Sequence, residues 1–398
     1  MSKINSLIRV LWHSYHFIAV ALLNTVVALI LLNVILSVMF QIKDHFSPDP
    51  VSTKYGDSII NAVYPGLSDS EIQELLKETW SRRRYIYEPF TQFKESPHQG
   101  VYVNVDINGF RLTKNQGPWP PQPNSFNIFL FGGSTTFGYG VQDDQTIASH
   151  LQEYLAARLK RDVRVYNFAR GHYYSTQERI LYEQLLTSGS VPDMAIFIDG
   201  LNDFYFNSNE PGFTSRFRDF MDKGITNNKT NNKGFIAATS IGRAVKGVQN
   251  RLWKEKTELD TYKHDFSDPQ IFTSVIQTYL MNKKIIEAVS KPFGVKPIFV
   301  WQPIPTYHYD LQYHPFSKKG FGKHSYSQYG YEHMHKLIEG NPLGDNFLWC
   351  ADIQKDENKP LYVDIAHYSS DFSAKFAMAI GNLLIERSLL KVNVSNSD

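Results

Sequence analysis

A chain of 398 residues with 42% hydrophobic and 14% aromatic residues is long enough to bury a large core. Its formal net charge of +2 at pH 7 is nearly balanced and its basic residues are scattered, so the composition gives no sign of a nucleic-acid-binding surface. The single cysteine, Cys350, excludes an intrachain disulfide, a cysteine-based metal site and a Cys-x-x-Cys redox motif.

Residues 17–40 contain no charged side chain. At a rise of about 1.5 Å per residue they are long enough to cross a hydrocarbon core of about 30 Å, so they predict one transmembrane helix. A buried helix of a soluble protein would normally show a polar face, and a cleaved signal peptide would end in a small-x-small site, which Ser37–Gln41 does not offer. An uncleaved signal anchor fits the segment better than either alternative.

The charges on either side of this helix predict its orientation. Lys3 and Arg9 precede the helix, whereas Lys43 behind it is offset by Asp44. The positive-inside rule therefore places residues 1–16 in the cytoplasm. The rest of the chain is then extracytoplasmic, in the periplasm, outside the cell or in the secretory lumen.

Two segments lie between the membrane helix and the main domain. Residues 41–66 are rich in Pro, Ser, Asp and Lys and lack helical periodicity, which is typical of a tether. Residues 67–124 begin with a capping box, Ser68 to Glu71, which predicts a short amphipathic helix. They continue with a predicted hairpin at Val101–Leu112, which has Asn-Gly at its turn.

The main domain spans residues 125–398, where short apolar runs alternate with helical patterns. Continuously apolar runs are typical of parallel strands covered by helices on both faces, so the pattern predicts an α/β domain with a mainly parallel sheet. Residues 204–267 break the alternation and indicate a long insertion. The predicted strands are 128–131, 163–168, 194–198 and 297–301, and the predicted helices are 146–159, 175–186, 269–289 and 372–388.

Four short motifs follow one another along this domain. The first three come after apolar runs, and loops that follow parallel strands meet at one edge of an open α/β sheet. We therefore expect their side chains to share a site at that edge. The motifs are Gly132-Gly133-Ser134-Thr135, Asn167–Gly171, Gly200-Leu201-Asn202-Asp203 and Asp364-Ile365-Ala366-His367.

Together, these motifs resemble the sequence blocks of the SGNH hydrolase superfamily, the GDSL-type esterases and lipases, over roughly residues 125–390. The resemblance implies a flavodoxin-like, three-layer α/β/α core. One block departs from the family pattern, because Gly-Gly-Ser-Thr stands here in place of Gly-Asp-Ser-Leu. That variant is similar to divergent branches associated with O-acetyl chemistry of surface polysaccharides, so lipase activity does not follow from the family name.

The resemblance implies a role for each matched residue. Ser134 is the nucleophile, His367 the base that takes its proton, and Asp364 the carboxylate that orients the imidazole. The N–H groups of Ser134 and Gly171, with the side-chain amide of Asn202, form the oxyanion hole. The residue types fit these roles, because a serine hydroxyl is a poor nucleophile until a neighbouring base accepts its proton.

Other interpretations of these residues stay open. Ser134 could instead cap a helix or belong to a phosphate-binding loop, and Asn202 could be an ordinary turn residue. The pair His333 and His335 has metal-ligand spacing, but no acidic residue joins it in a clear pattern, and we expect no metal and no organic cofactor. Three other histidines compete with His367 as the base: His172, His314 and His324.

Side chains beside the motifs are candidates for substrate contact. Aromatic rings in these loops could line a cleft that stacks sugars, and ordinary loop packing explains the same residues equally well. A glutamine ends the fourth predicted strand at the same edge of the sheet. The candidates are Tyr139, His172, Tyr173, Phe204 and Gln302.

The sequence therefore predicts a membrane-anchored, extracytoplasmic serine esterase that cleaves or transfers a short acyl group on a carbohydrate through an acyl-enzyme, acetyl being the first candidate. The expected partners are an acylated carbohydrate or another ester and, through residues 17–40, the lipid bilayer, with no nucleic acid. Two alternatives stay open. One is a polysaccharide O-acetyltransferase, and the other is a noncatalytic carbohydrate-binding or assembly protein with the same fold.

Overall fold

The computed structural model describes residues 2–46, 49–218, 221, 239–252 and 265–390. The chain divides into two compact units, residues 1–47 with 218–264, and residues 48–217 with 265–398. The predicted insertion at 204–267 contributes to both units. Three parts of it, 219–220, 222–238 and 253–264, lie outside the described residues.

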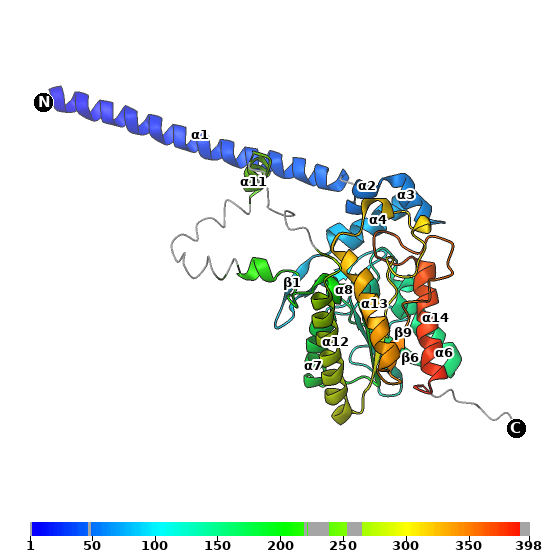
Figure 1. Ribbon diagram of the computed structural model, residues 1–398. Helices are drawn as coiled ribbons and strands as arrows, with labels where there is room; N and C mark the ends of the chain where they lie inside the picture. Colours follow the sequence, from blue (N-terminus) through cyan, green and yellow to red (C-terminus); the bar gives the residue numbers. More distant parts are fainter. Residues whose placement is uncertain (1, 47–48, 219–220, 222–238, 253–264, 391–398) are drawn as a thin grey trace. The chain divides into compact units, whose positions relative to one another are not determined.

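The first unit is built on one long helix, α1 (Ser2–Phe46) (Figure 1). Residues 9–43 of this helix are long and apolar enough to cross a membrane, and their most apolar stretch is not buried against protein. This agrees with the helix predicted at residues 17–40, and the observed helix extends further at both ends. Many of its leucine, isoleucine and valine side chains are exposed.

The insertion adds a second helix to this unit. Helix α11 (Ser240–Leu252) packs against α1, where Asn33 Oδ1 accepts the backbone N–H of Ile241 at 3.3 Å. The Arg243 guanidinium lies 4.3 Å from the centre of the Phe40 ring. This part of the insertion therefore belongs structurally with the apolar helix.

A five-stranded parallel sheet forms the centre of the second unit, with the strand order β6-β5-β7-β8-β9. In chain order this is 2-1-3-4-5, the order of flavodoxin-like folds, so the predicted α/β fold class is confirmed. The fifth strand has only three residues and did not stand out in the sequence. The strands are β5 (Phe126–Gly132), β6 (Val163–Asn167), β7 (Met194–Asp199), β8 (Lys296–Trp301) and β9 (Phe347–Trp349).

Helices cover both faces of the sheet, as Figure 1 shows. Successive side chains of a strand point to opposite faces, so Ile128 and Phe129 of β5 belong to two different core clusters. The domain therefore has three layers, as expected. The covering helices are α6 (Ile147–Leu159) and α14 (Ser370–Glu386) on the Ile128 face, and α7 (Ser175–Thr187), α12 (Pro269–Ser290) and α13 (Ser325–Gly340) on the Phe129 face.

The tether expected at residues 41–66 is wrong for most of its length. Helices α2 (Pro50–Tyr55) and α3 (Asp57–Val63) occupy it, and their apolar residues are buried in a third core cluster. Asp49 Oδ1 accepts the N–H of Val51 at 2.7 Å, and a proline begins α2. An acidic N-cap followed by proline is a helix-start signal, and it outweighs the missing periodicity in a helix too short to show any.

The accessory helix is confirmed. Ser68 and Glu71 form the predicted capping box at the start of α4 (Asp69–Lys77), which a π-helical turn, η1 (Glu78–Arg82), extends. Its inward face packs in the same cluster as α2 and α3, and this cluster also contains Phe137 of the main domain. The accessory segment therefore packs against the main domain and shares a buried core cluster with it.

The hairpin expected at Val101–Leu112 is only partly formed. The chain turns back between Asp106 and Phe110, but the returning limb bridges β4 (Asn104–Val105) only through Arg111, while β4 also pairs with β3 (His98–Gln99). A regular hairpin precedes it, in which β1 (Tyr85–Glu88) pairs with β2 (Gln92–Glu95). Short helical turns complete the described chain: α5 (Ser134–Phe137), η2 (Asp143–Gln145), α8 (Leu201–Tyr205), η3 (Lys291–Phe293), η4 (Leu311–Tyr313), η5 (Ser317–Lys319) and η6 (Gly322–His324).

Candidate active site

The loops that follow β5, β6 and β7 meet at the carboxyl edge of the sheet. Ser134 is the first residue of α5, directly after Gly132 and Gly133. A Cβ atom on Gly133 would collide with the side-chain amide of Asn202, so only glycine lets the first and third motifs approach this closely. Because Gly133 has no side chain, Asn202 can lie directly beside the start of α5, where Ser134 stands.

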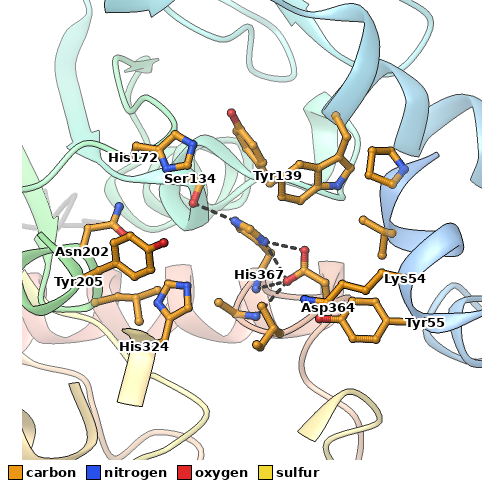
Figure 2. A pocket seen from close by; sticks show the side chains of 16 residues that line it. Lys54, Tyr55, Ser134, Tyr139, His172, Asn202, Tyr205, His324, Asp364 and His367 are labelled. Carbon is orange, nitrogen blue, oxygen red and sulfur yellow. Dashed lines mark hydrogen bonds and ion pairs between the residues drawn. The ribbon is translucent and has the colours of Figure 1, made fainter. Parts of the chain in front are cut away.

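Ser134, His367 and Asp364 form a continuous hydrogen-bonded chain (Figure 2). His367 Nε2 lies 2.8 Å from Ser134 Oγ, and His367 Nδ1 lies 2.7 Å from Asp364 Oδ2. The serine and the histidine are 233 positions apart in the sequence, so the fold and not a local turn brings them together. This is the order of contacts in which a carboxylate orients an imidazole and the imidazole accepts a hydroxyl proton.

The charge of Asp364 is secured by its surroundings. Burial opposes that charge, but the imidazole of His367 and the backbone N–H groups of Ala366 and His367, each 2.9 Å from Oδ1, outweigh burial and lower the pKa of Asp364 to about 2. The carboxylate is therefore ionised at any pH at which the imidazole can act as a base. The Asp-x-x-His spacing achieves this because a tight turn aims both N–H groups and the ring at one carboxylate.

Two aromatic rings hold the imidazole from the other sides. The Tyr139 ring stacks on His367 with 5.2 Å between ring centres, and the Trp80 ring meets His367 edge-on at 5.4 Å. Tyr139 follows the serine motif, whereas Trp80 comes from η1 in the accessory segment. The sequence named Tyr139 as a substrate contact, and the structure adds a position against the imidazole of His367.

Two of the predicted oxyanion-hole donors, the side-chain amide of Asn202 and the backbone N–H of Gly171, differ in their contacts. Asn202 Nδ2 donates one N–H to the carbonyl of Tyr173 at 2.7 Å, which leaves its second N–H for another acceptor. The backbone N–H of Gly171, by contrast, donates to Glu95 Oε1 at 3.1 Å. In this structure Gly171 therefore serves a buried carboxylate of the accessory segment.

Glu95 lies in a closed network beside the site. Its Oε2 pairs with Arg83 at 2.6 Å, and its Oε1 also accepts the Tyr139 hydroxyl at 3.1 Å. The side chains of both Arg83 and Glu95 are almost completely buried, at 2% and 3% exposed. Burial and the Glu95 charge raise the pKa of Tyr139 to about 12, so its hydroxyl keeps its proton and remains a donor.

The loop that carries Asn202 is braced from behind by the next residue. Asp203 Oδ1 accepts the hydroxyl of Ser175 at 2.6 Å, and its Oδ2 accepts the backbone N–H of Gly200 at 3.1 Å. Burial raises the pKa of Asp203, although these hydrogen bonds oppose the shift. Asp203 therefore ties the third motif to the start of α7 and does not face the cavity.

A cavity of about 260 Å³ opens over the serine and the histidine. Five of its lining residues come from α2 and η1, in segments where the sequence indicated only a tether and an accessory helix. The Asp-Pro helix start was the one sequence signal that could have identified α2 as part of a wall. The cavity is lined by Pro50, Val51, Lys54, Tyr55, Trp80, Ser134, Tyr139, His172, Leu201, Asn202, Tyr205, His324, Asp364, Ile365, Ala366 and His367.

Only two of the five candidate substrate contacts lie on this cavity, Tyr139 and His172. The other three are corrections to the sequence interpretation, because they are buried in the core. The Tyr173 hydroxyl donates to the carbonyl of Phe93, and Phe204 packs against Trp301. Gln302 Oε1 accepts the hydroxyl of Thr135 at 2.8 Å.

The competing histidines have no hydrogen bond to the serine. His172 and His324 line the cavity, and burial lowers the pKa of both, that of His324 to about 4. His314 is buried away from the cavity, where its Nδ1 accepts the N–H of Phe316. The pair His333 and His335 lies on α13, and no group of three or more potential ligands among the described residues could hold a metal ion.

Comparison with known proteins gives likenesses to solved structures only. No family model matches the chain, and no curated protein matches it. An acetylxylan esterase from Geobacillus stearothermophilus is 14% identical, with 69% of this chain and 100% of that chain covered and a TM-score of 0.34. The lipase/acylhydrolase from Enterococcus faecalis is 12% identical, with 68% and 99% covered and a TM-score of 0.36.

A third likeness is to a protein of the G-D-S-L family from Desulfitobacterium hafniense, at 12% identity, 65% and 100% coverage and a TM-score of 0.35. Likenesses of this size do not carry an assignment of family or activity.

Proposed function

We propose that the second unit is a serine esterase or acyltransferase that works through an acyl-enzyme on Ser134. The observation that carries this proposal is the 2.8 Å contact between His367 Nε2 and Ser134 Oγ, with Asp364 behind the imidazole at 2.7 Å. A structural serine would not need an ionised carboxylate and an imidazole aligned behind it, since a helix cap requires neither.

Acylation begins when Ser134 Oγ attacks the carbonyl carbon of the ester and His367 Nε2 takes the hydroxyl proton. Asp364 stabilises the imidazolium that forms and keeps Nδ1 protonated in the resting state. His367 then gives its proton to the departing alcohol oxygen as the carbon–oxygen bond breaks. The product is an ester of Ser134 and a free alcohol.

The tetrahedral intermediate carries a negative oxygen that needs hydrogen-bond donors. The N–H of Ser134 lies in the first turn of α5, where helical N–H groups have no acceptor within the helix. The second N–H of Asn202 lies beside it across Gly133. Gly171 joins this oxyanion hole only if its N–H leaves Glu95 during the reaction.

Deacylation decides between the two outcomes. If water attacks the acyl group with His367 as the base, the reaction is hydrolysis, and if a sugar hydroxyl attacks, it is acyl transfer. The cavity of about 260 Å³ has room for a short acyl group beside the serine, which supports acetyl as the first candidate. We place the reaction on an acylated carbohydrate outside the cytoplasm, with α1 as the membrane anchor.

Covalent labelling tests the nucleophile. A fluorophosphonate probe should modify Ser134 of the full-length protein in detergent, and mass spectrometry should locate the adduct on that residue. Ser134→Ala should not be labelled, while Ser327→Ala, at a serine buried in α13, is the matched control and should label as the wild type does. Label on another residue would mean that the nucleophile assignment is wrong, and no label on a protein that binds an acylated glycan would favour the noncatalytic alternative.

The same preparation separates hydrolysis from transfer when an acetyl ester is supplied with and without a glycan acceptor. Acetate release without acceptor indicates an esterase, and acceptor-dependent acetylation of the glycan indicates a transferase. Topology has its own test. Protease added outside intact cells should digest the large C-terminal part, and protection of that part would reverse the proposed orientation.

A further inference from the structure

A lysine-bearing segment beside the cavity plays no part in the chemistry described above. Residues 311–331 contain Lys318, Lys319 and Lys323 but no aspartate or glutamate, although 39 of the 398 residues in the chain are acidic. The segment runs from η4 to the first turns of α13 and supplies His324 to the cavity lining. Asp310 and Glu332 border the segment, and between them the three lysines are a local excess of positive charge.

Two of these lysines, Lys319 and Lys323, lie near the rings of tyrosines that line the cavity. Lys319 Nζ lies 5.2 Å from the centre of the Tyr55 ring, and Lys54 Nζ lies 4.8 Å from the same ring. The Lys319 amine also donates to the backbone carbonyl of Lys54, which joins η5 to α2. Tyr55 and Lys54 both line the cavity, so two ammonium groups stand at this end of it.

The opposite end carries a third ammonium group. Lys323 Nζ lies 5.9 Å from the centre of the Tyr205 ring, and Tyr205 packs against His324 with 4.7 Å between ring centres. Figure 2 shows Lys54 and Tyr55 on one side of His367, and Tyr205 with His324 on the other. The nucleophile and its base therefore lie between two positively charged ends.

No counter-charge neutralises these groups in the part of the chain that the structure describes. Lys54, Lys319 and Lys323 are exposed and have no ion pair with a described residue. The one acidic residue on the cavity is Asp364, whose carboxylate is committed to His367. The imidazole of His324 is neutral at pH 7 because its pKa lies near 4, so the three lysines set the charge.

We propose that the ester substrate is a polyanion, an O-acylated polysaccharide with carboxylate or phosphate groups on its sugars. This deepens the proposed function and rests on it. Anionic groups on either side of the acylated sugar would meet the Lys54–Lys319 end and the Lys323 end while the acyl group enters between them. Since charges interact over about 8 Å at physiological salt, ammonium groups at the mouth raise the local concentration of such a chain.

Substrate choice tests the proposal. The full-length protein is given O-acetylated polygalacturonate, which carries carboxylates, and O-acetylated xylan, which is neutral, at matched acetyl density. The expected ratio of kcat/KM for the two is about 10 to 100 in favour of the polyanion at low salt, falling toward one as salt rises from about 0.01 M to about 0.5 M. An acetylated phosphate-bearing glycan, as a third arm, shows whether phosphate serves as well as carboxylate.

Charge removal then locates the effect. Lys54→Gln with Lys319→Gln and Lys323→Gln should bring the ratio close to one, and arginine at the same three positions should restore it. The control removes three exposed lysines that do not line the cavity, Lys160, Lys284 and Lys291, and should leave the ratio unchanged. An equal loss in the control would mean that net charge alone acts, and this result would overturn the proposal.

The outcomes also separate this inference from the proposed function. If the wild type hydrolyses a small neutral acetyl ester but shows no preference for the polyanion, the substrate inference is wrong and the esterase proposal stands. If it hydrolyses neither ester and transfers no acetyl group, the proposed function itself fails.

Discussion

The two sides of Ser134, the proposed nucleophile, are held in different ways. On the histidine side, the hydrogen bonds run among residues of two sequence motifs, and Asp364 and His367 are only three positions apart. On the oxyanion side, Gly171 donates to Glu95, which is 76 positions away in the accessory segment. A motif thus specifies the contacts made inside it, whereas contacts brought in by another segment depend on the whole fold.

The buried carboxylates on the two sides, Asp364 and Glu95, are also stabilised in different ways. Asp364 is stabilised by one imidazole and two N–H groups, all supplied by its own turn. Glu95 relies on Arg83, and a buried ion pair contributes little net stability while the loss of one partner costs about 3–5 kcal/mol. Asp364 is therefore held by its own turn, whereas Glu95 joins the accessory segment to the domain through Tyr139 and Gly171.

The largest effect on turnover among partial changes is expected on the histidine side. Asp364→Asn keeps the shape but removes the charge that stabilises the imidazolium, so kcat for an acetyl ester should fall by about 10⁴-fold. The protein should remain folded. Turnover equal to that of the wild type would defeat the role of Asp364 and favour His172 or His324 as the base.

The same variant has a stability signature. The pKa of Asp364 is lowered in the folded state to about 2, so its stabilising contribution is present above the ordinary value of about 4 and is lost as the pH falls through about 2. Denaturant unfolding should show Asp364→Asn less stable than the wild type by about 2 kcal/mol at pH 7. The difference should shrink steadily between pH 4 and pH 2, and a constant difference would contradict the assignment.

A smaller effect is expected across Gly133. Asn202→Ala removes one oxyanion donor and should lower kcat by about 10²–10³-fold with little change in KM. Asn207→Ala, in the turn that follows α8, is the control and should keep full activity. A rise in KM with kcat unchanged would mean that Asn202 binds substrate and does not stabilise the transition state.

The sequence predicted the sheet, four of its strands and the covering helices because buried parallel strands and amphipathic helices leave strong patterns over several residues. It also predicted the Ser134, His367 and Asp364 cluster, from the position of Ser134 after a strand, the Asp-x-x-His spacing before the last helix and the resemblance to the SGNH blocks. It missed the α2 wall and placed Tyr173, Phe204 and Gln302 on the cavity. Which way a loop side chain points depends on neighbours such as Phe93 and Thr135, and those contacts leave no trace in sequence spacing.

The smallest effect on turnover, and the sharpest test of the comparison, is expected at Glu95. Glu95→Gln keeps an oxygen that accepts the N–H of Gly171 but removes the negative charge beside Arg83. Because the acceptor remains, kcat of the folded enzyme should change by less than about tenfold. The free energy of unfolding should fall by about 3–5 kcal/mol, measured in denaturant, because the buried guanidinium loses its partner.

An exposed ion pair nearby provides the control for that measurement. Arg82 pairs with Glu74 at 45% and 35% side-chain exposure, so Glu74→Gln should cost less than about 1 kcal/mol. Glu95→Ala extends the test, because it also frees the Gly171 N–H. If turnover of the folded Glu95→Ala enzyme rises above that of Glu95→Gln, the freed N–H has joined the oxyanion hole. If it falls instead, Gly171 acts by holding Glu95 and the Tyr139 ring in place, and the oxyanion side of this site works with Ser134 and Asn202 alone.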